Sequence, residues 1–152
     1  MKREQTLQFN AHNIKEFRRR GGTLGGNFEG APVLLLTTVG AKSGKPRTSP
    51  MMYLPDGQRL IVFASNAGAD THPAWYHNLR ANPSAWVEVG TERYPVTATE
   101  LAGAERDQLF EEQSRRYPGF ARYQANTQRQ IPVLALTRAD QPTPQRELHR
   151  WQ

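Results

Sequence analysis

The short connections between successive apolar segments restrict the fold of this chain more than any other feature. Six segments have the length and composition of β-strands. They are residues 33–38, 48–54, 59–65, 85–89, 93–100 and 133–137. An Asp-Gly turn at 55–58 joins the second segment to the third, and residues 90–92 join the fourth to the fifth. Parallel neighbours need a crossover of about a dozen residues or more, so the sequence predicts a mainly antiparallel sheet.

Helical signals predict one helix before the strands and three among them. The first helix is expected to begin at Asn13, with Glu16 as the reciprocal partner of this N-cap, and to end at Gly21. Ile14 and Phe17 are expected to supply its apolar contacts. The other predicted helices cover residues 73–81, 103–116 and 120–126.

The length of 152 residues predicts one domain. We place it at residues 1–138, followed by a polar, flexible tail at 139–152. Closing about six strands into a barrel removes the exposed edges of the sheet. The predicted fold class is therefore mainly β with flanking helices (α+β), with the antiparallel strands arranged as a barrel.

The charge of the chain favours an anionic partner. Twenty Lys and Arg residues face fourteen Asp and Glu residues, which gives a formal net charge of +6. Nucleic acid, an acidic lipid surface and a phosphorylated cofactor would all be attracted. The sequence has no recognition-helix, RNA-binding or zinc-finger motif, so we predict no nucleic-acid partner.

Targeting and metal-binding signals are absent from the sequence. No secretory apolar segment and no run of membrane-spanning length is present, which predicts a cytoplasmic protein. The basic first helix, with Ile14 and Phe17, also permits peripheral contact with an acidic membrane. The chain lacks cysteine, and His72 and His77 are poorly spaced for one helix face, so we predict no metal site.

The segment 40–50 is the most informative chemical motif. Two glycines bracket a Lys-Ser pair, and Lys45 and Arg47 follow. Backbone N–H groups in such a loop, together with basic side chains, can bind an anion. The spacing and Pro46 exclude a P-loop. Residue chemistry alone favours the alternative of a solvated basic hairpin.

Aromatic residues near the predicted helices allow two interpretations. Tyr117, Phe120 and Tyr123 recur every three residues and would share a face of a helix. Core packing and a lid over a ligand both fit this spacing. The same choice applies to Trp75 and Tyr76, of which we expect Tyr76 to lie in the core.

An ordered set of motifs extends over residues 13–137. The motifs are Gly-Gly-x-x-Gly-Gly-x-Phe at 21–28, Leu-Leu-Leu-Thr-Thr at 34–38, Lys-Ser-Gly-Lys-Pro-Arg at 42–47, Ala-Ser-Asn-Ala-Gly at 64–68, His-Pro-Ala-Trp-Tyr-His-Asn-Leu at 72–79, Ala-Asn-Pro at 81–83, Tyr-Pro-Gly-Phe at 117–120 and Arg-Gln-Ile-Pro-Val at 129–133. Together they resemble the deazaflavin (F420)-dependent nitroreductase and F420H2-dependent quinone reductase family.

This resemblance implies a split β-barrel related to FMN-binding and pyridoxamine-oxidase barrels. It also implies an enzyme that transfers a hydride from reduced coenzyme F420 to a quinone-like, nitroaromatic or other electron-poor small molecule. The coenzyme carries a long anionic phospholactyl-polyglutamate tail. The alternatives are a split-barrel flavoprotein that binds FMN and a non-catalytic protein that binds the deazaflavin or a lipid. Both a monomer and a homodimer are compatible with the family.

The resemblance further implies which residues form the site. The cofactor-binding set is Lys42, Ser43, Lys45, Arg47, Thr48, Ser49, Pro50, Met51, Met52, Phe63, Ala64, Ser65, Asn66, Ala74, Trp75 and Asn78. Tyr117, Phe120 and Tyr123 are implied to cover the substrate. Tyr123, Tyr117 and Ser65 are the candidate catalytic residues, with Tyr123, Ser65 or water delivering the proton that follows the hydride.

Three positions depart from the family pattern. Phe120 stands where some nitro-reducing members carry tyrosine, which argues against nitroimidazole reduction. Ala67 stands where a second glycine is frequent, and Asp70 where proline is common. The last two changes are expected to reshape a loop near the cofactor ring without abolishing binding.

Overall fold

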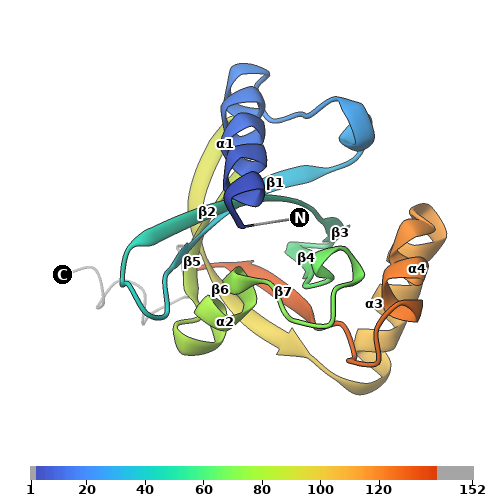
Figure 1. The fold of residues 1–152 in the computed structure, drawn as a ribbon. Coiled ribbons are helices and arrows are strands. Elements are labelled where there is room, and N and C mark those ends of the chain that lie inside the picture. Colours follow the sequence, from blue (N-terminus) through green and yellow to red (C-terminus); the bar gives the residue numbers. More distant parts are fainter. Residues whose placement is uncertain (1–2, 140–152) are drawn as a thin grey trace.

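The structure, a computed structural model, describes residues 3–139, and its strands form one antiparallel sheet (Figure 1). The strand order in the sheet is β2-β1-β5-β6-β7-β4-β3. The strands are β1 (Val33–Val39), β2 (Pro46–Met52), β3 (Leu54–Asp56), β4 (Arg59–Phe63), β5 (Ser84–Val89), β6 (Glu92–Leu101) and β7 (Val133–Arg138). Every neighbouring pair is antiparallel, which confirms the predicted sheet.

The two edge strands of the sheet are consecutive in the chain. β2 ends at Met52 and β3 begins at Leu54, so only Tyr53 separates them. The sheet must therefore curl until its two ends meet. We predicted one strand over residues 48–54, which is wrong because the pairing partner changes at Tyr53: residues up to Met52 pair with β1, whereas Leu54 pairs with Ile61 of β4.

Strand β1 is buried on both faces. Leu34 and Leu36 point into a core cluster together with Val62 and Val87. Val33 and Leu35 point the other way, into a cluster with the helix residue Phe17. This double burial explains why β1 reads as a continuous apolar run rather than as an alternating one.

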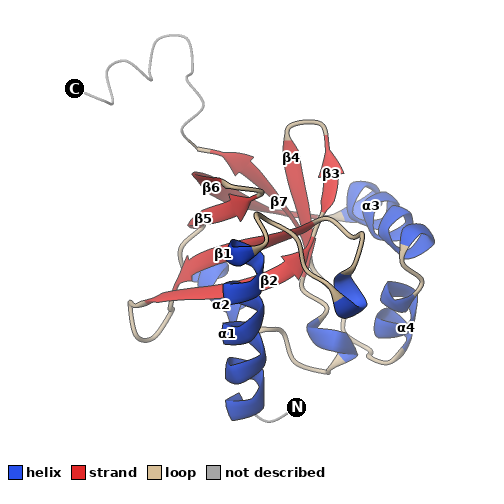
Figure 2. Ribbon diagram, turned by 90° about the horizontal axis from the view of Figure 1, so that it is seen from above, coloured by secondary structure: helices blue, strands red, loops and turns tan. Residues whose placement is uncertain are grey.

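The helices lie on the outside of the curled sheet. They are α1 (Arg3–Arg19), α2 (Ala74–Ala81), α3 (Gly103–Arg116) and α4 (Gly119–Ala125), with 3-10 turns η1 (Gly26–Phe28) and η2 (Asn66–Gly68). Figure 2 shows α1 along one side of the sheet and α3 and α4 together at another. The predicted bounds of α3 are confirmed, and those of α2 and α4 are shifted by about one residue at their starts.

The predicted start of the first helix is wrong. The helix begins at Arg3, so Asn13 lies in its middle rather than at its N-cap. Asn13 is buried, and Glu16 pairs with Arg19 instead of returning to a cap. The segment before Asn13 is polar, with Leu7 and Phe9 as its large apolar residues, so it shows little of the periodicity that marks a helix.

Ile14 and Phe17 supply the apolar contacts of α1, as predicted, and these contacts are with the rest of the protein. Phe17 is 1% exposed, and Ile14 packs against the cluster around it. Leu7 and Phe9 are the exposed large apolar residues of α1. No helix among residues 3–139 combines the length and apolar character needed to cross a bilayer. The predicted flexible tail lies outside the described residues from position 140 onward.

A buried arginine joins α3, α4 and β7. The Arg106 guanidinium donates two hydrogen bonds to the Ile131 carbonyl, at 2.7 and 3.1 Å, and one to Gln124 Oε1 at 2.9 Å. The same guanidinium lies 4.6 Å from the centroid of the Phe110 ring. These contacts fix the segment that leads from α4 into β7.

We expect Arg106→Met to lower the free energy of unfolding by about 1.5–3 kcal/mol, because charge-assisted bonds to a buried carbonyl are lost. Chemical denaturation measures this loss. The control is Arg116→Met on the same helix, whose exposed pair with Glu112 is expected to contribute less than about 0.5 kcal/mol. Equal losses in the two variants would show that Arg106 has no special role.

Candidate functional site

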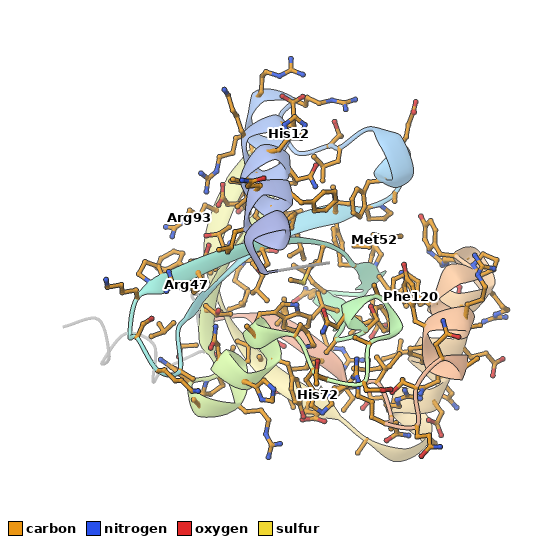
Figure 3. All side chains as sticks on the ribbon, viewed as in Figure 1. His12, Arg47, Met52, His72, Arg93 and Phe120 are labelled. Atoms are coloured by element: carbon orange, nitrogen blue, oxygen red, sulfur yellow. The ribbon has the colours of Figure 1, made fainter. Side chains whose placement is uncertain are left out.

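A cavity of about 920 Å³ lies between α1, β2, η2, α2 and α4. This is within the usual size of cofactor and ligand pockets, about 300–1,000 Å³. In Figure 3, Arg47 and Phe120 lie far apart across the molecule, with Met52 and His72 between them. All four residues line the cavity, so the cavity is elongated and its lining comes from several elements.

The loop between β1 and β2 forms one end of the cavity. The Gly40 N–H donates to the Lys45 carbonyl at 2.8 Å, and the Gly44 N–H donates to the Gly40 carbonyl at 2.9 Å. Gly44 has φ of +72°, and a Cβ on Gly40 would stand 2.5 Å from Ser43 Oγ. Glycine is therefore favoured at Gly44 by its backbone conformation, and a side chain at Gly40 would force Ser43 Oγ to move.

The end of the cavity at this loop is rich in unused hydrogen-bond donors. Among the described residues, Lys42 and Arg47 have no carboxylate partner. Within the same part of the chain, the N–H groups of Lys42 and Ser43 have no backbone or side-chain acceptor. By contrast, Arg18 pairs with Glu88 at 2.8 Å. The loop therefore presents a cationic, N–H-rich surface that suits an anion.

Asn78 of α2 holds this loop in place. Its Oδ1 accepts the Ala41 N–H at 2.9 Å, and its Nδ2 donates to Thr38 Oγ1 at 3.0 Å. The side chain is buried, although the residue also lines the cavity. Its polar atoms are used within the protein, so Asn78 supports the loop between β1 and β2.

The opposite end of the cavity is aromatic. The Phe120 ring packs edge-on against Phe63 at 5.6 Å and against Tyr123 at 5.4 Å between centroids. All three side chains line the cavity. Tyr117 caps the C-terminus of α3 and belongs to the same cluster, but it does not line the cavity.

The η2 loop lines the cavity and has a strained backbone conformation. Asn66 and Ala67 have φ of 48° and 54°, in the left-handed region. This conformation costs about 1–2 kcal/mol for a residue with a Cβ. The buried Gly68 lies so close to α4 that a Cβ there would be 3.2 Å from the Tyr123 backbone. Glycine is therefore required at the contact between this loop and α4.

Arg129 binds backbone carbonyls on both sides of η2. Its guanidinium donates to the carbonyls of Ala64, Ser65 and Ala69 at 3.1, 2.8 and 2.8 Å. Arg129 Nη1, which donates to Ala64, also lies 3.0 Å from His72 Nδ1. These bonds hold the strained loop against the rest of the protein.

His72 lines the cavity beside this network. Burial, followed by the charges of Arg129 and His77, lowers the pKa of the His72 imidazole below its ordinary value. The ring packs 4.6 Å from Tyr76, whose hydroxyl donates to Glu100 at 2.7 Å. Tyr76 is 3% exposed and lies in the core, as predicted.

The cavity brings together most of the residues implied by the motifs. Those that line it are Lys42, Ser43, Arg47, Thr48, Ser49, Pro50, Met51, Met52, Phe63, Ser65, Asn66, Ala74, Trp75, Asn78, Phe120 and Tyr123. Lys45, Ala64 and Tyr117 do not line it. Lys45 is exposed on the loop, and Ala64 is fully buried with its carbonyl bound by Arg129.

Other lining residues had no place in the sequence-based site. They are Leu7, Asn10, Phe28, Gly40, Ala41, Ala67, His72, Pro73 and His77. Leu7 and Asn10 were missed because the start of α1 was placed too late. His72 and Pro73 directly precede Ala74 in a motif that was recognised, and this proximity was the available signal. Residues 3–139 contain no cluster of three or more His, Cys, Asp or Glu side chains suited to a metal ion.

Comparison with known proteins agrees with this architecture. A family model described as F420H(2)-dependent quinone reductase matches residues 10–138. The F420H(2)-dependent quinone reductase Rv1261c of Mycobacterium tuberculosis is 40% identical over 129 residues, which cover 80% of this chain and 85% of the relative. The solved structure of an F420-H2 dependent reductase, FDR-A, is 42% identical with a TM-score of 0.64, covering 69% of this chain and 93% of that one.

Two further solved structures extend the comparison. One, described as a domain-swapped dimer, is 37% identical with a TM-score of 0.66 and covers 83% of this chain and 95% of its own. The heme storage protein HutZ of Vibrio cholerae is 19% identical with a TM-score of 0.54, over 82% of this chain and 87% of that one. The likeness to HutZ concerns the fold alone.

The curled antiparallel sheet with flanking helices is a split β-barrel, as the motifs implied. The chain belongs to the F420H(2)-dependent quinone reductase family. This membership confirms the predicted enzyme class, an oxidoreductase, and the predicted cofactor, coenzyme F420 rather than FMN.

We expect Asn78→Ala to release the loop between β1 and β2. The Ala41 amide and Thr38 hydroxyl lose their buried partner, which should lower the free energy of unfolding by about 1–3 kcal/mol. Hydrogen exchange at the Ala41 amide should become faster. The control is Asn82→Ala at the exposed end of the same helix, where only the Ser84 N–H loses an acceptor. Unchanged exchange at Ala41 in Asn78→Ala would contradict this role.

Proposed function

We propose that this protein binds reduced coenzyme F420 along the cavity and transfers its hydride to a quinone-like acceptor held at the aromatic end. The observation that carries the proposal is the difference between the two ends of the cavity. Cations without carboxylate partners and amides without acceptors lie at one end, and aromatic rings lie at the other. A ligand with an anionic tail and a flat ring system fits both ends. Bound F420H2 supplies the hydride, and the protein binds, orients and shields the reactants.

We propose that the anionic tail lies over the loop between β1 and β2. Lys42 and Arg47 are the cations that line this end, and the N–H groups of Lys42 and Ser43 add uncharged donors. Charge-assisted contacts with a phosphate or carboxylate contribute about 1.5–3 kcal/mol when well formed.

We propose that the ring system lies between β2 and the η2 loop. Residues 48–52 would form one wall, and Phe63, Ser65 and Asn66 the other. Phe120 and Tyr123 would cover the acceptor and exclude water. Because Phe120 lacks the hydroxyl of a tyrosine, quinones are favoured over nitroimidazoles and other nitroaromatic acceptors.

The proton that follows the hydride requires a donor near the acceptor. Ser65 Oγ has no hydrogen-bonding partner among residues 3–139, and Tyr123 lines the cavity beside Phe120. We propose these two hydroxyls, or ordered water, as the proton sources. Tyr117 would act only by packing behind them.

We expect the purified protein to accelerate the oxidation of reduced F420 by a soluble quinone. Stopped-flow absorbance of the deazaflavin measures the rate, with NADPH and reduced FMN as control donors. Acceleration with reduced F420 but with neither control supports the proposal. If F420 binds tightly but no quinone in a panel of different sizes accelerates its oxidation, the protein is a deazaflavin-binding protein without turnover.

We expect Lys42→Ala and Arg47→Ala each to weaken F420 binding about tenfold or more, since a charge-assisted contact is lost. Affinity should fall as salt concentration rises, and less steeply in these variants. Isothermal titration at two salt concentrations measures both effects.

Two variants of equal charge serve as comparisons for the anion-binding loop. Lys45→Ala changes the same loop outside the cavity lining and should weaken binding less than about threefold. Lys15→Ala, on the exposed side of α1, should leave the affinity within about twofold. If all four substitutions weaken F420 binding equally, the loop contributes only non-specific electrostatic attraction.

Assembly and location are further proposals. A relative described as a domain-swapped dimer supports a homodimer as one possible assembly. We propose a cytoplasmic location. Because Phe17 is buried, peripheral contact with an acidic membrane would have to use Leu7 and Phe9 among the exposed residues of α1.

A further inference from the structure

The hydrogen-bond network of Arg129 determines the tautomer of His72. A guanidinium can only donate hydrogen bonds, so His72 Nδ1, 3.0 Å from Arg129 Nη1, must be an acceptor without a proton. In the neutral ring the proton is then on Nε2. Among the described residues, Nε2 has no hydrogen-bonding partner, and His72 lines the cavity. The ring therefore has one nitrogen fixed by the protein and one N–H available to a ligand.

The position of the His72 ring is fixed from several sides. Tyr76 and His77 pack against it at 4.6 and 5.7 Å between ring centroids. Arg129 is itself held by the carbonyls of Ala64, Ser65 and Ala69. A donor held by its neighbours loses little conformational entropy when a ligand binds.

The charges around His72 oppose its protonation. Arg129 lies in the segment before β7, Arg80 and His77 are on α2, and Glu100 is on β6. The first three disfavour a positive charge on the ring, whereas Glu100 favours one but is already bound by the Tyr76 hydroxyl. Protonation would also place a hydrogen on Nδ1 and break the contact with Arg129. The neutral form is thus the form that keeps the network intact.

We propose that His72 is a neutral hydrogen-bond donor to a carbonyl or enolate oxygen of the ligand in the cavity, and that Arg129 is the positioning residue that fixes its tautomer. This inference rests on the proposed function, because both the deazaflavin ring and a quinone carry such oxygens. His72 keeps its proton, and the proton that follows the hydride comes from another donor. A neutral imidazole can polarise a carbonyl in this way without changing its own charge.

The tautomer is tested in the ligand-free protein. Nitrogen NMR of the imidazole side chains should show His72 with its proton on Nε2 at neutral pH, and a pKa below the ordinary value of histidine. In Arg129→Met the preference for this tautomer should weaken. A His72 ring with its proton on Nδ1 overturns the inference whether or not F420 binds.

Ligand binding is tested with two substitutions of His72. His72→Leu removes the donor and should weaken binding of the ligand it contacts by about three- to tenfold. His72→Gln keeps an uncharged N–H donor and should weaken binding less. Because the pKa of His72 is lowered, wild-type affinity should hold at about pH 6.5, the ordinary pKa of histidine, and fall only at lower pH, where the ring becomes protonated. The same pH series is measured for His72→Gln, which has no imidazole at this position. Any fall in affinity that the wild type shows and His72→Gln lacks comes from His72 and not from titration of the ligand. His12→Gln is the control for loss of an exposed histidine.

The two sources of the oxygen give different results. If the Kd for F420, measured by its fluorescence, rises in His72→Leu, the contact is with the deazaflavin ring. If that Kd is unchanged but the KM for the quinone rises, the contact is with the acceptor. If both constants stay unchanged while F420 binds normally, His72 is only structural and this inference fails while the proposed function stands. If the wild type does not bind F420 at all, the proposed function fails first.

Discussion

The direct succession of the two edge strands is the constraint on which the rest of the structure depends. Because one residue, Tyr53, carries the chain from β2 to β3, the sheet cannot remain flat. The curl brings the β2 wall opposite the loop that follows β4, and these two segments bound the cavity. It also leaves β1 enclosed between the interior of the barrel and α1, which accounts for its unbroken apolar sequence.

Two arginines play related structural roles at one irregular segment. Residues 126–132 connect α4 with β7 and have little regular structure. Arg106 binds the carbonyl near the end of this segment, whereas Arg129 extends from it to three carbonyls of the η2 loop. Irregular backbone is thereby stabilised by guanidinium donors where a sheet or helix would use amides. The strained residues Asn66 and Ala67 lie between Ser65 and Ala69, whose carbonyls Arg129 binds.

The sequence predicted the sheet because its signals are local: turn residues and apolar runs of strand length. Most of the residues that the family resemblance implied for the site line the cavity, because the motifs that carry them occur in the same order along the chain. It failed where position depends on tertiary contacts. Nothing in the polar residues before Asn13 shows that they continue α1 toward the cavity. Nor could sequence reveal that Arg129 reaches back over sixty positions to the carbonyl of Ser65, because a hydrogen bond to a backbone carbonyl leaves no trace in the partner's side chain.

The support that Asn78 gives to the loop between β1 and β2 also affects the thermodynamics of ligand binding. The loop is closed by its own amides and fastened to α2 through the Ala41 N–H, so its conformational entropy is lost when the protein folds. A ligand that reaches Lys42 and Arg47 then meets a backbone that is already ordered, and less of the interaction energy is spent on arranging it. The same rigidity restricts the range of anions that fit, because a preformed turn cannot adapt to the spacing of their charges. For the anionic tail proposed to bind this loop, the expected consequence is selectivity for the shape of the tail rather than for its charge alone.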